Sequence, residues 1–115
     1  MLLTDIEAKL QEIDPKVFYG MVDNSVNETV WNYIVFNRTT LGFPANKTGA
    51  SDYFDVSIIR ENFIPEGIDT EIIQKLNALP GVRLAANDGE FNYVLKPNTN
   101  IVVEMLTLHF VRARK

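Results

Sequence analysis

The sequence contains no cysteine and a single histidine, His109, among its 115 residues. Without cysteine the chain has no disulfide and no thiol nucleophile, a composition that suits a reducing cytoplasm. Most general acid-base and nucleophilic devices draw on His or Cys. The near absence of both residues favours a protein that acts through surface and edge contacts, and we expect neither enzymatic activity nor a cofactor.

Basic residues are also few. Eleven Lys and Arg stand against fifteen Asp and Glu, which gives a net charge of −4 at pH 7. Nucleic-acid binders concentrate Lys and Arg, so we expect no sequence-specific nucleic acid partner. The cluster Arg112, Arg114 and Lys115 is an exception, although a basic end this short is usually just a solvated terminus.

Long apolar runs are missing as well. No stretch approaches the roughly 20 residues that a membrane-spanning helix needs. Asp5 and Glu7 follow the first apolar residues too closely for a secretory signal. We therefore expect no membrane partner. The length suits one domain, 1–115, which can bury roughly two-thirds of the surface of its unfolded chain.

The first half of the chain predicts one helix followed by strands. Ile6, Leu10 and Ile13 share one stripe, which predicts a helix over 5–13 that ends before Pro15. Apolar residues then alternate in the manner of strands. The strands predicted in this half are 16–22, 29–37 and 52–61. Apolar residues on both faces of 29–37 favour a central strand, with helices on one side and a further element or a neighbouring subunit on the other.

The second half repeats this order. Ile72, Leu76 and Leu79 lie on one face of a second helix, which Pro80 stops. The strands predicted after it are 82–86, 91–96 and 101–111, of which the last should lie near the middle of the sheet. Asn87-Asp88-Gly89 predicts a tight hairpin turn, because such turns need positive φ. The order αβββαβββ predicts an α+β domain, with a mostly antiparallel sheet and both helices packed on one face.

A long loop is predicted over 38–51, where the alternation stops and Gly42, Pro44 and Gly49 accumulate. Loops of this length inside compact domains are uncommon and tend to be functional. Leu41 and Phe43 within it suggest burial on binding. A flexible hairpin tip without a partner is the alternative.

Catalysis by His109 would need a carboxylate beside it, and Glu104 is the nearest candidate in sequence. Five residues apart on one strand, the two side chains point to opposite faces. We therefore interpret His109 as a packed or edge residue. The sequence also has no cluster of metal ligands and neither the GxxxxGK[ST] nor the GxGxxG phosphate-binding motif.

The order of segments along the whole chain resembles the tail terminator or tail completion proteins of long-tailed bacteriophages and prophages, which are also called minor tail or head-tail joining proteins. The segments that carry this resemblance are the N-terminal amphipathic helix, Tyr19-Gly20, the run 31–38, the loop, the run 52–56, and the run 62–66 before the second helix.

The resemblance implies a non-enzymatic virion protein that is assembled in the cytoplasm of a bacterial host. Such a protein forms a ring, commonly a hexamer, that caps the finished tail tube and presents a surface to the head. Its partners would be other copies of itself, the tail tube protein and the head-tail connector proteins. We expect the loop and the basic end to make these contacts. The candidate contact residues are Arg38, Leu41, Phe43, Lys47, Arg112, Arg114 and Lys115.

Two alternatives stay open. A head-side neck, head completion or minor capsid protein would share the fold and the partners. A small-ligand-binding or enzymatic α+β domain belongs to another class, and it would need a pocket near His109.

Overall fold

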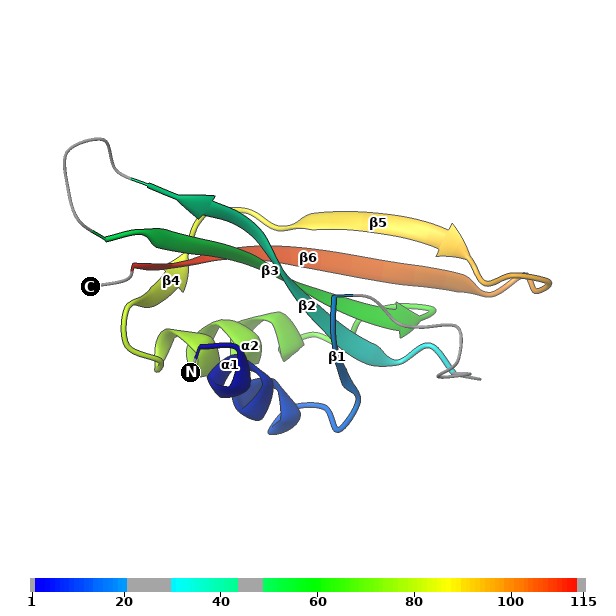
Figure 1. Ribbon diagram of the computed structural model, residues 1–115. Coiled ribbons are helices and arrows are strands. Elements are labelled where there is room, and N and C mark those ends of the chain that lie inside the picture. The colour runs from blue at the N-terminus through cyan, green and yellow to red at the C-terminus, as the bar shows by residue number, and fades with distance from the viewer. Residues whose placement is uncertain (1, 21–29, 44–48, 114–115) are drawn as a thin grey trace.

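Two helices cover one face of a six-stranded sheet whose three long strands run the length of the molecule (Figure 1). A computed structural model describes residues 2–20, 30–43 and 49–113. The elements are α1 (Leu2–Gln11), β1 (Val17–Tyr19), β2 (Tyr33–Gly42), β3 (Ser51–Glu61), α2 (Ile68–Asn77), β4 (Val82–Leu84), β5 (Glu90–Leu95) and β6 (Val102–Ala113). The predicted fold class, α+β in the order αβββαβββ, is confirmed.

The strands lie in the order β1-β2-β3-β6-β4, and β5 pairs with the same side of β6 as β4 does. β6 is therefore central, as predicted from its length. All pairs are antiparallel except β1 with β2. This one parallel pair differs from a simple succession of hairpins. A parallel neighbour requires that the chain begin β2 at the same end of the sheet at which it began β1, unlike a hairpin.

The main core lies between the helices and the sheet. Ile6 and Leu10 of α1, with Ile72 and Leu76 of α2, are fully buried against the sheet. We call the sheet surface that they cover the helix face. The strand residues in this core are Ile34, Phe36, Phe54, Val56, Ile58, Leu106, Leu108 and Phe110. Their spacing of two along each strand follows the pleat of the sheet.

A second, smaller cluster lies on the opposite surface of the sheet, the far face. Tyr33, Ile59 and Val103 are buried there, and Trp31 and Met105 pack against them. The apolar residues on both sides of β2 are thereby explained: one set faces the helices and the other joins this cluster. Part of the expected covering of the far face is supplied by the chain itself.

The loop predicted over 38–51 is shorter in the structure. β2 continues to Gly42 and β3 begins at Ser51, so Arg38 and residues 40–42 form strand pairs. The alternation was hidden because the register shifts between Arg38 and Thr40. One extra residue, Thr39, forms a β-bulge there, which breaks the period of two that marks a strand in sequence.

The hairpin predicted at Asn87-Asp88-Gly89 is wrong. β4 and β5 do not pair with each other; both pair with β6, one after the other along its edge. Gly89 lets the backbone before β5 lie close to β6, and it is not part of a hairpin turn. A methyl group at Gly89 would lie 2.9 Å from Leu108 Cδ2 and 3.1 Å from the Thr107 carbonyl oxygen. The segment crosses β6 closely, and a side chain would not fit.

Candidate functional site

Three of the four described candidate contacts, Leu41, Phe43 and Arg112, gather at one end of the sheet, and Arg38 lies outside this group. The register places Leu41 opposite Asp52, and Asp52 opposite Arg112, in one row across three strands. We call this the hairpin end; it consists of residues 40–43, 49–53 and 111–113. Figure 1 shows it away from the helices, beside the C-terminus. The two segments proposed as contacts from sequence are thus brought together. Lys47, Arg114 and Lys115 lie outside the described residues.

Apolar side chains at the hairpin end are poorly covered. Phe43 is 74% exposed and Leu41 41% exposed, whereas Phe36 further along the same strand is buried. Large apolar groups left in water at the end of an arm are what a partner surface covers on binding. The role of these two side chains as anchors stays a prediction.

Arg38 has a role inside the fold. Its Nε donates a hydrogen bond to the Tyr19 hydroxyl at 3.1 Å. The Tyr19 ring packs against Phe36 with 5.1 Å between ring centroids. Arg38 therefore helps to hold the short edge strand β1 against β2, which the sequence did not indicate.

Arg112 is half-buried and is not a freely solvated terminal residue. It lies opposite Asp52 on one side and Val82 on the other. Asp52 is only 4% exposed. The expectation that the basic end is simply solvated does not hold at Arg112, because strand β6 continues through Ala113.

A polar cluster on the far face contains His109. Its Nδ1 lies 2.7 Å from Asp55 Oδ1, and its Nε2 lies 2.8 Å from Glu90 Oε1. Asp55 is directly opposite His109 in the β3–β6 register. Sequence reasoning missed this partner, because it considered only a carboxylate on the same strand. The signal would have been the cross-strand register, which no local pattern supplies.

The surroundings of His109 favour its charged form. The pKa of His109 is raised above its ordinary value by the hydrogen bond to Asp55, and next by the one to Glu90, while partial burial opposes the shift. Both ring nitrogens are occupied by carboxylates. An imidazole held in this way has no free nitrogen with which to take a proton from a substrate. The neighbouring pair on this face, Ser57 and Thr107, is a hydroxyl contact of 2.9 Å.

A hollow of about 200 Å³ adjoins this cluster. It is lined by Thr39, Thr40, Tyr53, Asp55, Ala85, His109 and Phe110. The hollow is below the usual size of small-molecule pockets, roughly 300–1,000 Å³. The bulge at Thr39 contributes to its wall, so it lies close to the hairpin end.

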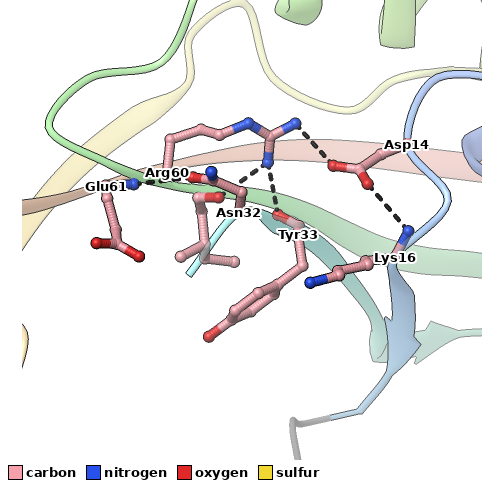
Figure 2. A network of polar contacts seen from close by, with 7 residues as sticks. Asp14, Lys16, Asn32, Tyr33, Arg60 and Glu61 are labelled. Carbon is pink, nitrogen blue, oxygen red and sulfur yellow. Dashed lines mark hydrogen bonds and ion pairs between the residues drawn. The ribbon is translucent and has the colours of Figure 1, made fainter. Parts of the chain in front are cut away.

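A polar network lies at the opposite end of the sheet, and its role is structural (Figure 2). Arg60 donates to Asp14 Oδ2 at 2.7 Å and to the Tyr33 carbonyl at 3.1 Å. Asp14 in turn accepts the Lys16 backbone N–H at 2.9 Å. Asp14 follows α1 and Lys16 precedes β1, so this network fixes the path from the helix into the sheet.

Glu61 extends this network. It accepts the Trp31 backbone N–H at 2.6 Å and lies 3.2 Å from Lys96 Nζ. The pKa of Glu61 is lowered, chiefly by the hydrogen bond from the Trp31 N–H; desolvation opposes this shift, and the hydrogen bond and charge of Lys96 add to the lowering. No buried side-chain polar atom lacks a partner in the parts of the chain that the structure describes.

Within residues 2–20, 30–43 and 49–113, no group of three or more His, Cys, Asp or Glu side chains could hold a metal ion. No helix among these residues is long and apolar enough to span a membrane. A scan against protein-family models finds no match to the chain, and a search of curated proteins finds none either.

Proposed function

We propose that this chain is a structural virion protein of a tailed phage or prophage, which forms a ring that terminates the tail tube and joins it to the head. The observation that carries the proposal is the hairpin end, where exposed Leu41 and Phe43 share one end of the sheet with Arg112. The order of segments along the chain, which resembles that of tail terminator proteins, supplies the identity of the assembly.

The mechanism is surface complementarity. Leu41 and Phe43 of one copy insert into the surface of a ring neighbour or of the tube, where burial of apolar area stabilises the contact by about 25 cal/mol per Å². A small number of buried aromatic anchors supplies most of the binding energy at such interfaces. Ring closure then blocks the addition of further tube subunits, and the opposite surface of the ring is left for the head connector.

The test compares a variant that lacks the apolar anchors with a variant of an exposed phenylalanine elsewhere on the chain. Leu41→Ser with Phe43→Ser removes the anchors, while Phe63→Ser is a matched control, since Phe63 is 70% exposed at a distance from the hairpin end. Phage that carry the anchor variant should make overlong tails and lose infectivity, and phage with Phe63→Ser should keep normal tails. Normal tails beside unjoined heads would instead support a head-side neck protein. Normal, infectious particles from the anchor variant would overturn the proposal.

The hollow beside His109 gives a specific reason to keep a ligand-binding domain as a second candidate. Asp55 and His109 line its wall, where a carboxylate and an imidazole could hold a small polar molecule. The pairing of both ring nitrogens argues against this role. A thermal shift panel of metabolites, run on the wild type and on His109→Gln, tests it: a ligand that stabilises only the wild type would favour the second candidate.

A further inference from the structure

The free edge of β5 is a long, poorly protected edge of the described sheet. All six residues of β5 are exposed, including Phe91 at 54%, Tyr93 at 60% and Leu95 at 61%. A strand in a soluble protein usually hides at least one face. Figure 1 shows β5 along the outer border of the sheet. A long apolar edge strand of this kind is a template for pairing with another strand.

The other edges of the described sheet carry protective features. β1 and β4 have only three residues each. β2 beyond β1 contains the bulge at Thr39 and the charged Arg38, and both features discourage strand pairing. β5 contains no bulge and no proline, and its only charged residue is Glu90 at its start. Pairing between chains is therefore directed to β5.

The backbone groups that point outward from β5 can be assigned. The Lys96 N–H donates to the Ile101 carbonyl at 2.9 Å, so the backbone groups of Lys96 point toward the strand that contains β6. Along an antiparallel ladder, residues whose backbone groups point toward the partner strand alternate with residues whose groups point away. Counting back from Lys96, the backbone groups of Val94, Asn92 and Glu90 therefore point toward β6. The groups that face outward belong to Phe91, Tyr93 and Leu95.

We propose that β5 pairs with β5 of a second copy of this chain, antiparallel across a two-fold axis that passes beside Tyr93. In this register Tyr93 lies opposite Tyr93 of the second copy, and Phe91 lies opposite Leu95. Each of these pairs brings outward N–H and C=O groups face to face, so the two residues can exchange both hydrogen bonds. The two sheets become one continuous sheet.

The side chains also match in this register. On the helix face, the Tyr93 rings of the two copies lie opposite each other, and Phe91 of each copy lies opposite Leu95 of the other. Aromatic–aromatic and aromatic–aliphatic pairs of this kind are favourable across strands. On the far face the two-fold axis places Glu90 opposite Lys96 of the second copy, so unlike charges meet. Within one copy the half-buried Lys96 contacts Glu61 at 3.2 Å, and Glu90, whose side chain is 67% exposed, contacts His109. No like charges face each other.

The other antiparallel registers that keep the same outward groups are poorer. With the axis beside Asn92, Glu90 would face Val94 and Leu95 would face Gly89. With the axis beside Val94, Phe91 would face Pro97, which has no N–H to donate. Only the register centred on Tyr93 pairs the three outward residues with one another, and this register also opposes unlike charges.

This contact does not rest on the proposed function. A two-fold contact gives a dimer, whereas a ring with one face for the tube and another for the head is closed by head-to-tail contacts, for which the hairpin end is the proposed site. The dimer is measured on the purified chain in solution, while tail termination is measured in phage. The two proposals can therefore fail separately.

The first experiment measures mass in solution by sedimentation equilibrium. The wild type should associate through a two-fold step, and Tyr93→Lys should raise the dissociation constant of that step by about tenfold or more, because two lysines would then face each other. Phe63→Lys is the matched control, because it places a lysine at another exposed aromatic residue, 70% exposed and outside β5, and it should leave this step unchanged. A monomeric wild type, or an unchanged dissociation constant for Tyr93→Lys with native circular dichroism, would overturn the proposal.

The second experiment tests the register and exploits the absence of cysteine. In Tyr93→Cys the two thiols would face each other across a hydrogen-bonded pair, with about 5.5 Å between Cα atoms, which lies within disulfide range. Mild oxidation should therefore give a covalent dimer. Val94→Cys is the control: it is also exposed, but the two-fold axis places it opposite Asn92, so it should remain largely monomeric. Cross-linking of Val94→Cys without Tyr93→Cys would exclude this register.

Phe91→Cys and Leu95→Cys should cross-link when mixed and much less when oxidised separately.

Discussion

His109 is held between two carboxylates, and this geometry has a consequence for its titration. Nδ1 and Nε2 can both donate only when the ring is protonated, so the contacts with Asp55 and Glu90 are strongest in the charged form. The pKa of His109 is raised accordingly. A group whose pKa is higher in the folded than in the unfolded chain stabilises the fold at low pH, and this contribution is lost as pH rises through the folded pKa.

We predict that Asp55→Asn lowers the pKa of His109 more than Glu90→Gln does, because the Asp55 hydrogen bond is the larger cause of the shift. His109 is the only histidine, so its ring resonances in a proton NMR titration need no assignment. The free energy of unfolding of the wild type should exceed that of His109→Gln by on the order of 1 kcal/mol near pH 6. The difference should shrink above the folded pKa. A pKa at the ordinary value in the wild type would contradict this account.

Arg60 and Asp14 form an ion pair that, unlike the contacts of His109, is nearly excluded from water. Their side chains are 12% and 9% exposed, and Figure 2 shows the guanidinium between Asp14 and the Tyr33 carbonyl. Removing one partner of a buried pair leaves an uncompensated charge, which costs about 3–5 kcal/mol. We predict losses of this size for Asp14→Asn and for Arg60→Met in urea unfolding.

The double variant supplies the control for this pair. Asp14→Asn with Arg60→Met should cost clearly less than the sum of the two single changes, because no lone charge remains. Glu12→Gln breaks the exposed contact with Lys75 and should have a much smaller effect. Additive losses at Asp14 and Arg60 would mean that the two side chains stabilise the fold independently.

At the scale of elements, the sequence predicts best where the pattern is local. The alternation in 52–61 and 101–111 predicted β3 and β6 to within two residues, because both strands have one face in the main core. The predictions from sequence were wrong where contacts between distant segments determine how the strands pair. The bulge at Thr39 shortened the loop, and the pairing of β4 and β5 with β6 replaced the hairpin. The candidate contacts at Leu41 and Phe43 could be identified as exposed apolar residues, but the Asp55 partner of His109 depends on register.

The close passage of the β4–β5 connection over β6 gives a prediction at this scale. Gly89→Ala should lower the free energy of unfolding by about 1–3 kcal/mol, since the added methyl meets the Leu108 side chain and the Thr107 carbonyl, and the backbone cannot give way easily. Gly42→Ala is the matched control, because its methyl would lie 3.4 Å from the Tyr53 ring, an ordinary contact. Equal stabilities of the two variants in urea would show that the connection is not tightly packed.

At the scale of the whole molecule, the two proposed contact surfaces lie on different parts of an elongated body of 52 × 29 × 23 Å. The hairpin end terminates the long strands, whereas the free edge of β5 runs along the border of the sheet (Figure 1). Surfaces that share no residues act independently in assembly. Two independent contacts on one chain can build a closed particle, while either one alone stops at a smaller species.

We therefore predict a hierarchy of masses at high protein concentration. The wild type should form the largest species, and Leu41→Ser with Phe43→Ser should stop at the two-fold dimer, because β5 is intact. Tyr93→Lys should give a species smaller than the wild type that retains the contact through the hairpin end. All three changes combined should give a folded monomer, because both surfaces are then lost. Light scattering coupled to size exclusion measures these masses, with circular dichroism to confirm the fold. If the combined variant kept the mass of either parent, association would have to use a third surface, and neither contact would account for assembly.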